Sequence, residues 1–380
     1  MLDLPYNLAV LLVDAAALLA IARWPRPRTV LRAAFLAGAA AVALTAPFRI
    51  EGFHAMRLLC WALFVHAPLD LLGAAVLLWR APGRAAAGSE GEERADPRVR
   101  PLVGALVGLA ALLVAVAVDA FLIEPTWLEV TRLRLPAPGL ARPLRIVLLA
   151  DIQTDHIGEH ERAALRRAAE CDADLVLFAG DYVQCIGWPA QRREAEAFRQ
   201  ALLETGLGGR LGGFAVQGDV DEDGWTEQFR GTRIATRPAF TSERPREDVE
   251  LICLPTPLSR SPGLKLPPRD GRYRILLGHA PDVALGDPDA DLVLAGHIHG
   301  GQVRLPGIGP LLTLSQVPRR MAVGATTLPS GLTLVVSRGI GLERVYAPRL
   351  RFLCRPELVV LDLVPAPRRA TAAGVDPRGE

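Results

Sequence analysis

The hydrophobic positions divide the chain into two regions with different patterns. Before Pro125 they form four long apolar stretches, at residues 7–22, 31–48, 58–79 and 102–123. Each stretch approaches the ~20 residues that a helix needs to cross the hydrocarbon core of a bilayer. Helices of a soluble domain would keep a polar face, and the run from Leu106 to Val116 has none. The pattern therefore predicts a multi-pass α-helical membrane region over residues 1–124, with four transmembrane helices in contact with the lipid bilayer.

The placement of arginines predicts how this region is oriented. The first and third connections between the apolar stretches are rich in arginine, whereas the second is poor and the residues before the first stretch have none. Since basic connections stay in the cytoplasm, both ends of a four-span region would lie outside. We therefore expect a multi-pass protein of the cell membrane with an extracytoplasmic C-terminal domain, although the arginines after the last stretch argue the opposite way.

Ionisable residues also occur within the apolar stretches. His66 and Asp70 are four residues apart and share one face of a helix, and Asp14 lies in the first stretch. Such groups are candidates for function inside a membrane. No repeat or broken helix typical of a transporter accompanies them, so we expect them to form hydrogen bonds between helices.

A second pattern begins after a proline-rich connector. Short apolar runs typical of buried strands alternate with polar stretches typical of helices. Five of these runs end at an acidic residue or a histidine, namely Asp151, Asp181, Asp219, His279 and His297, and His299 follows two residues later. Ligands of open α/β sheets bind beyond the carboxyl ends of the strands, so these side chains should lie together.

The residue types at these strand ends predict a metal centre. A single Asp after a strand usually forms a turn or caps a helix, but five coincident cases are not explained in this way. Three carboxylates buried together would repel one another unless cations lie between them. Three carboxylates and three imidazoles suffice for two divalent cations, which can activate a water and clamp the oxygens of a phosphoryl group.

Other chemistries find less support in the sequence. No Gly-x-Gly-x-x-Gly follows the first strand, and no P-loop or Gly-x-Ser-x-Gly turn occurs. The five cysteines form no Cys-x-x-Cys pair. A net charge of +2 gives no reason to expect nucleic acid as a partner.

The order of the motifs resembles a known family. Asp-x-polar, Gly-Asp, Gly-Asp-x-Asp, Gly-His and Gly-His-x-His follow one another as in the calcineurin-like metallophosphoesterases. Residues 299–306, 337–341 and 355–358 are most similar to the bacterial membrane-tethered branch of that family. The resemblance implies an α/β metallophosphoesterase domain of two packed mixed β-sheets flanked by helices over residues 144–364. A connector, 125–143, would precede it, and a disordered tail, 365–380, would follow.

The resemblance also assigns metal ligands. It makes Asp181 the bridging ligand, gives Asp151 and His299 to one metal, and gives Asp219, His279 and His297 to the other. Gln153 stands where the family has a histidine, and Asp219 stands where it has Asn. Both changes favour oxygen-preferring ions, so of Mn, Mg, Fe and Zn we expect two Mn ions.

The third departure affects catalysis. Val220 replaces a histidine that stabilises the transition state or protonates the leaving group in the family. His156 and Asp221 are nearby catalytic substitutes, although His156 could equally be solvated beside a helix cap at Asp155. Arg304, beside the His-x-His turn, is the predicted substrate-binding residue.

Together these features predict a membrane-tethered, metal-dependent phosphoesterase. It would hydrolyse a phosphodiester or pyrophosphate bond by metal-activated hydroxide, and its tether points to a lipid-linked substrate. A leaving group that is itself a phosphate would need less protonation, which favours a pyrophosphate. The alternative is a catalytically impaired metal- or ligand-binding membrane protein on the same fold, because Gln153 and Val220 alter the site.

Overall fold

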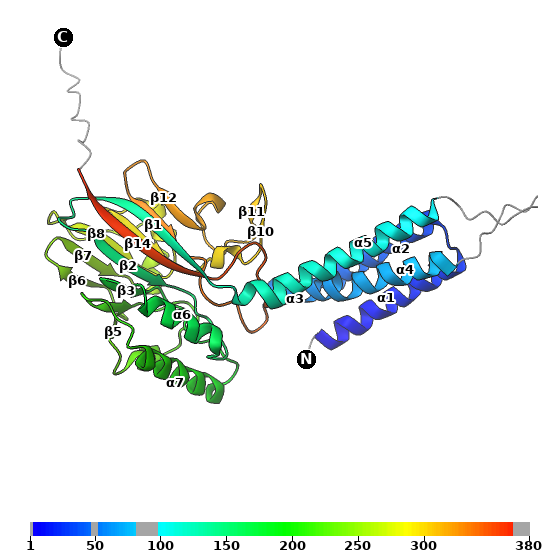
Figure 1. Ribbon diagram of the computed structural model, residues 1–380, viewed down its shortest axis with the longest axis horizontal. Helices are drawn as coiled ribbons and strands as arrows, with labels where there is room; N and C mark the ends of the chain where they lie inside the picture. Colours follow the sequence, from blue (N-terminus) through cyan, green and yellow to red (C-terminus); the bar gives the residue numbers. More distant parts are fainter. Residues whose placement is uncertain (1–2, 47–51, 81–97, 368–380) are drawn as a thin grey trace, which may run out of the picture. The chain divides into compact units, whose positions relative to one another are not determined.

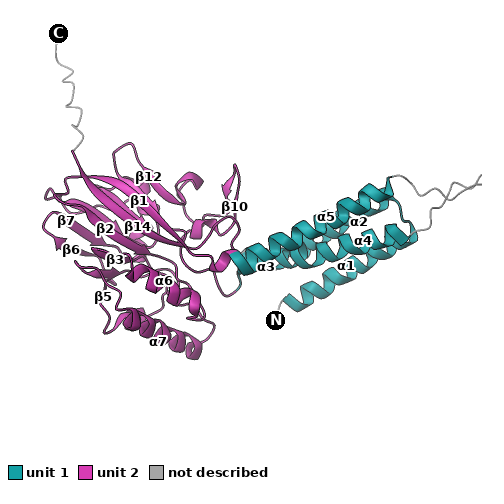
Figure 2. Cartoon of the chain, in the orientation of Figure 1, with its two compact units in different colours: residues 1–123, 346–349 teal, residues 124–345, 350–380 magenta. Residues whose placement is uncertain are grey.

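The computed structural model describes residues 3–46, 52–80 and 98–367 (Figure 1). The chain forms two compact units (Figure 2). The first comprises Met1–Ile123 together with Tyr346–Arg349, and the second comprises Glu124–Val345 together with Leu350–Glu380. The division near residue 124 lies where the apolar stretches give way to the alternating pattern.

The first unit is built from helices. They are α1 (Asp3–Arg23), α2 (Pro27–Ala43), α3 (Gly52–Trp61), α4 (Ala67–Arg80) and α5 (Val99–Val118). The π-helical turn η2 (Ala62–His66) joins α3 to α4, and η3 (Asp119–Ile123) and η4 (Glu124–Thr126) extend α5. Within the described residues, three helices are long and apolar enough to cross a membrane: Asp3–Arg23, Phe53–Arg80 and Val99–Thr126.

The second predicted span differs from the others. We expected it over residues 31–48, but α2 has only 17 residues and ends at Ala43. The end of the predicted span, after residue 46, lies outside the described residues.

Polar side chains inside this unit connect its helices. His66 lies on η2, and its Nδ1 is 2.7 Å from Oδ2 of Asp14 on α1. The other ring nitrogen of His66 is 3.0 Å from Oδ1 of Asn7, which lies about two turns before Asp14 on the same face of α1. A buried histidine with partners at both nitrogens satisfies its polar atoms, as expected for a hydrogen-bonded contact between helices.

The second unit contains two mixed six-stranded sheets. In spatial order the first consists of β1 (Glu129–Pro138), β14 (Glu357–Ala366), β2 (Leu144–Leu149), β3 (Leu175–Phe178), β4 (Gly213–Ala215) and β5 (Ile234–Thr236). The second consists of β12 (Gly324–Thr327), β13 (Thr333–Val336), β9 (Leu292–Ala295), β8 (Tyr273–Leu277), β7 (Val249–Cys253) and β6 (Thr241–Arg246). The expected arrangement, helices followed by an α/β domain with two mixed sheets, is confirmed.

The central strands are buried on both faces, which explains their nearly continuous apolar sequences. In β2, Ile146 belongs to the core between the two sheets, whereas Val147 belongs to the core beneath the helices. That second core includes Phe198 of α7 (Trp188–Thr205), and α6 (Glu159–Ala169) lies beside α7 over the same sheet (Figure 1). A third core covers the outer face of the second sheet, where Ile252 and Met321 pack.

The segment expected to be a connector is largely a strand. Within residues 125–143, β1 runs parallel to β14 from Glu129↔Glu357 to Pro138↔Ala366. Its prolines suggested a linker, but β1 is an edge strand, where a missing N–H donor is tolerated. β14 likewise extends to Ala366, into the predicted tail, whereas residues 368–380 lie outside the described part of the chain.

Arg351 organises the loop between β13 and β14. Its guanidinium is fully buried and donates hydrogen bonds to four backbone carbonyls, those of Arg338, Gly339, Gly341 and Cys354. The same loop binds the backbone after β2, since Gly341 N–H donates to the Asp151 carbonyl at 2.7 Å.

Replacing Arg351 by methionine should destabilise the second unit by at least about 3 kcal/mol, because several buried carbonyls lose their donor. Hydrogen exchange of the amides of β13 and β14, followed by mass spectrometry, measures this change. Arg244→Met is the control, since the Arg244 side chain is 65% exposed. Equal exchange rates in the two variants would contradict this role of Arg351.

Candidate metal centre

The carboxyl ends of five strands meet at one place in the second unit. β2, β3 and β4 pair in parallel in the first sheet, and β8 and β9 pair in parallel in the second. Their ends bring the predicted ligands into two groups, Asp219–His279–His297 and Asp151–Asp181–His299. Within each group the candidate ligand atoms lie within 4.8 Å of one another.

Asp181 lies between the two groups. It belongs to the second group, and its Oδ2 is also 3.3 Å from Nε2 of His279 in the first. His279 Nε2 is 3.4 Å from Oδ2 of Asp219, and His297 Nδ1 is 3.0 Å from the same oxygen. Asp181 is therefore the residue best placed to contact two neighbouring cations.

Backbone carbonyls fix which histidine nitrogens face the centre. His279 Nδ1 lies 2.8 Å from the Ala179 carbonyl, and His297 Nε2 lies 3.0 Å from the Leu314 carbonyl. A carbonyl oxygen only accepts, so each of these nitrogens carries the proton. The opposite nitrogen of each ring faces a carboxylate oxygen. Although burial lowers the pKa of His279, the charge of Asp181 and hydrogen bonds to Asp181 and Asp219 hold it well above its usual value, so these carboxylates favour positive charge at the ring. Divalent metal ions, which bind imidazole nitrogens and carboxylates together, fit this donor set.

His299 supports the same conclusion from burial. The side chain is 4% exposed, and within the described residues neither of its ring nitrogens has a hydrogen-bond partner. Burial, together with the charge of Arg351, lowers the pKa of His299 to about 3, so the ring is neutral. A buried neutral imidazole with two unpaired nitrogens is costly unless a metal ion uses one of them.

Asp151 is held from two sides. Both of its carboxylate oxygens accept the backbone N–H of His297, at 2.9 and 3.0 Å. A Cβ at Gly296 would come within 2.7 Å of the same carboxylate, which explains the glycine before His297. Burial raises the pKa of Asp151 to about 7, so a nearby positive charge is needed to keep it ionised at neutral pH.

The backbone at the centre is strained. Five of the seven predicted ligands have a positive φ, namely Asp151, Gln153, Asp181, His297 and His299. Side chains other than glycine rarely adopt this region, and such residues concentrate at functional sites.

Gln153 offers an oxygen close to the second group. Its backbone N–H donates to the Asp181 carbonyl at 2.9 Å, and its side-chain Nε2 donates to Gln184 at 2.9 Å. The buried Oε1 has no hydrogen-bond partner in the described part of the chain. This amide oxygen is free to act as a neutral ligand, and the role of Gln153 as a metal ligand stays a prediction.

Asp221 has a different role from the predicted one. Its Oδ2 accepts the backbone N–H groups of Asp181 and Gly218 at 2.9 and 2.7 Å, and its Oδ1 accepts that of Tyr182 at 2.9 Å. The carboxylate thus ties the end of β3 to the end of β4. Because both oxygens are engaged by the backbone, Asp221 positions Asp181 and is not a proton donor or acceptor for a substrate.

His156 also lies elsewhere than predicted. Its side chain is 77% exposed, and its Nδ1 is 3.4 Å from Oε2 of Glu194 on α7. It belongs to neither group of ligands. The turn that carries it directs the imidazole to the surface, so the solvated alternative describes its position better than a catalytic role.

Arg304 borders a separate hollow. It lies on β10 (Arg304–Leu305), which pairs with β11 (Gly309–Pro310). With Arg319 and Arg320 it lines a cavity of about 660 Å³. The contact of Arg304 with substrate stays a prediction.

Two residues near the centre have no signal in the sequence. Arg260 follows the short helix α8 (Thr256–Ser259), and its Nη2 contacts Oδ2 of Asp219 and lies 3.1 Å from Nε2 of His297. The other residue is Glu343. Burial and the nearby charge of Asp181 raise the pKa of its carboxyl, which places Glu343 beside the centre. Neither ends a strand or belongs to a motif, so only the folded chain identifies them.

Comparison with known proteins agrees with this geometry. No profile of a protein family matches the chain. It is 29% identical to the phosphodiesterase YaeI of Escherichia coli (strain K12) over 264 residues, which cover 63% of this chain and 90% of YaeI. It is 30% identical to the uncharacterized metallophosphoesterase YkuE of Bacillus subtilis (strain 168) over 210 residues, 51% of this chain and 69% of YkuE. A third relative, the uncharacterized metallophosphoesterase Cj0846 of Campylobacter jejuni, is 35% identical over 102 residues, 26% of this chain and 25% of Cj0846. The chain therefore belongs to the metallophosphoesterase family.

Proposed function

We propose that this protein is a membrane-associated phosphoesterase that uses two divalent cations to hydrolyse a phosphodiester or pyrophosphate bond. The observation that carries the proposal is the pair of ligand groups at the strand ends, with Asp181 next to both. Relatives named as a phosphodiesterase and as metallophosphoesterases support this chemistry.

The proposed ligands fall into two sets, one for each cation. One cation would be held by Asp151, His299 and the Gln153 oxygen. The other would be held by Asp219, His279 and His297, and Asp181 would contact both cations. Two such cations activate a water and neutralise charge on phosphoryl oxygens. The four oxygen donors among these seven ligands favour manganese over softer ions.

Arg260 is suited to contact the phosphate of a substrate. Its side chain is 40% exposed while its guanidinium adjoins Asp219, so it faces both the centre and solvent. If His297 Nε2 donates to the Leu314 carbonyl, it cannot also accept from Arg260. An N–H of Arg260 is then left to donate to a phosphoryl oxygen, as arginines commonly do.

Val220 decides between an active and an impaired enzyme. Its backbone N–H donates to Oδ1 of Asp181 at 3.0 Å, but its apolar side chain can transfer no proton. A pyrophosphate substrate suits such a site, because its leaving phosphate needs little protonation. The impaired, ligand-binding alternative rests on this residue together with Gln153, and turnover distinguishes the two.

Membrane association is supported by the three helices that are long and apolar enough to span a bilayer. Arg23 ends α1 and Arg80 ends α4, consistent with a cytoplasmic location for the ends of these helices. We extend this to an extracytoplasmic catalytic unit in the cell membrane and to a lipid-linked phosphate substrate.

Asp181→Asn should remove most metal and activity, because it weakens both cation positions at once. We expect fewer than two manganese ions per chain and a loss of turnover on bis(p-nitrophenyl) phosphate of more than about 100-fold. Metal analysis and turnover are measured on the same sample, with Asp289→Asn, 65% exposed at its side chain, as the control. Full metal loading of the native chain without turnover on phosphodiesters or pyrophosphates would support the impaired alternative.

Arg260→Ala should leave two manganese ions bound but lower kcat/KM by about 10- to 100-fold, the contribution of a charge-assisted hydrogen bond. The loss should appear mainly in KM and in weaker inhibition by inorganic phosphate. Arg260→Lys should recover part of it, and Arg244→Ala should match the native chain. Unchanged kinetics in Arg260→Ala would show that this residue only neutralises Asp219.

The membrane proposal predicts that the full chain stays in the membrane pellet after alkaline carbonate extraction. A C-terminal fusion to alkaline phosphatase should be active, because this reporter folds only outside the cytoplasm. Release into the supernatant would contradict membrane insertion. A fluorescent C-terminal fusion to green fluorescent protein, together with an inactive phosphatase fusion, would show that the C-terminal unit faces the cytoplasm.

A further inference from the structure

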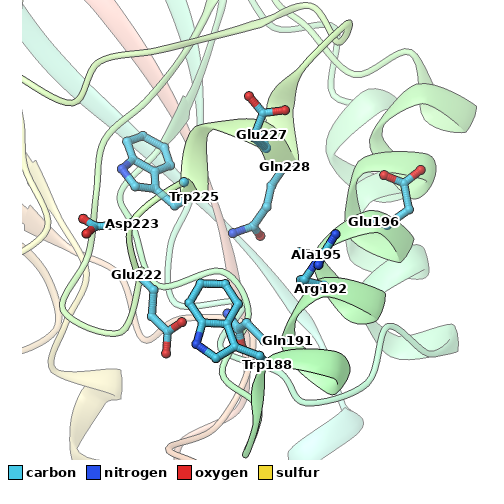
Figure 3. Close-up of a pocket in the computed structure, with 11 residues that line it drawn as sticks. Trp188, Gln191, Arg192, Ala195, Glu196, Glu222, Asp223, Trp225, Glu227 and Gln228 are labelled. Atoms are coloured by element: carbon cyan, nitrogen blue, oxygen red, sulfur yellow. The ribbon is translucent and has the colours of Figure 1, made fainter.

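A second pocket lies between α7 and the short helix η5 (Trp225–Phe229), and none of the metal ligands lines it (Figure 3). Its volume is about 580 Å³. Eleven residues line it: Trp188, Gln191, Arg192, Ala195, Glu196, Glu222, Asp223, Gly224, Trp225, Glu227 and Gln228. Two indoles and four carboxylates among them give the pocket an aromatic and acidic character.

A buried amide points to a ligand that donates hydrogen bonds. Gln228 is 5% exposed, and its Oε1 has no hydrogen-bond partner among the residues that the structure describes. Figure 3 shows its amide end extending from η5 into the space framed by the lining residues. Gln191 Nε2 donates to the Val183 carbonyl at 2.9 Å, and within the described residues it makes no hydrogen bond to Gln228. A buried unpaired acceptor is costly, so an occupant with an N–H or O–H would relieve it.

The carboxylates around this amide favour a positively charged ligand. Glu196 pairs with Arg199 and Glu227 with Arg230. Glu222 and Asp223, by contrast, make no ion pair within the described residues, although both line the pocket. Their two negative charges lack a counterpart in the wall other than Arg192, which is exposed on α7.

The aromatic walls suit the same ligand. Trp188 is 61% exposed, whereas Trp225 is buried and stacks on Tyr182 with ring centroids 5.7 Å apart. Indole faces attract cations, and an exposed tryptophan in an otherwise polar wall is free to cover one. We propose that this pocket binds a primary ammonium group, held by Gln228 Oε1, the carboxylates of Glu222 and Asp223, and the ring of Trp188.

A primary ammonium is preferred over a quaternary one because Gln228 requires an N–H donor. The assignment uses none of the metal ligands and does not rest on the phosphoesterase function. Glu222, which lines the pocket, directly follows Asp221 in the chain. Asp221 accepts the backbone N–H of Asp181, so the pocket borders a residue that holds a metal ligand in place.

Three small probes test the proposal on the full chain in detergent. Ethanolamine carries the ammonium, choline replaces its N–H groups by methyls, and ethylene glycol replaces the ammonium by a hydroxyl. Ethanolamine should change tryptophan emission saturably, in the millimolar range that a ligand of this size can reach. Choline should bind at least about fivefold more weakly, for want of the N–H donors, and ethylene glycol should give no saturable change. Equal responses to ethanolamine and ethylene glycol, or no saturable response to ethanolamine, would overturn the proposal.

Variants connect the signal to the pocket. Gln228→Leu should weaken ethanolamine binding about fivefold while leaving the thermal unfolding midpoint unchanged or higher, since it removes an unpaired buried oxygen. Glu222→Gln, at an exposed position, should weaken binding several-fold without affecting folding, and Glu247→Gln, exposed elsewhere, should not. Trp188→Phe should abolish most of the emission change. Native affinity in both Gln228→Leu and Glu222→Gln would rule the site out.

Discussion

The second unit must hold the carboxylates and imidazoles of its candidate metal centre close together. Asp151, Asp181 and Asp219 end three parallel strands, and His279 and His297 each turn a ring nitrogen toward these carboxylates. Neither repulsion nor burial favours this arrangement by itself, so positive charge must contribute to it. Much of the neighbouring structure restrains these groups: Asp221 binds the backbone of Asp181, and the loop held by Arg351 binds the backbone of Asp151. Metal ions bound by these residues would therefore also stabilise the domain.

The glycines of the motifs follow from the same crowding. A Cβ at Gly218 would overlap the carboxylate of Asp181, and one at Gly296 would press on Asp151. The left-handed backbone at Asp181 and His299 has a similar origin, because the chain must turn sharply to direct these side chains inward. Motif spacing thus records geometric limits at the strand ends, and this is why it can be read from the sequence.

The sequence predicted best where one short segment determines both position and chemistry. Each of the apolar runs before Asp151, Asp181 and His297 is a strand, and those residues lie together. It predicted less where distant segments decide. The segment of β1 was predicted to be a connector because it is rich in proline. A strand tolerates these prolines only at the edge of a sheet, and the pairing with distant β14 that places β1 there is not visible in its own sequence. His156 and Asp221 were chosen for closeness in sequence to motifs, but the direction of each side chain is set by Glu194 and by backbone donors from β3 and β4. Arg260 approaches from another loop altogether.

The relation between Asp219 and Arg260 bears on whether the altered third motif still supports chemistry. An additional carboxylate at a centre that already holds two others would weaken folding and overload the site with negative charge. The guanidinium of Arg260 meets this carboxylate directly, so the charge is balanced on the side open to solvent. The same contact brings a cationic donor to the face where a substrate phosphate would enter. The pairing balances the added charge of Asp219, and it leaves Arg260 at the position that the proposed contact with a substrate phosphate requires.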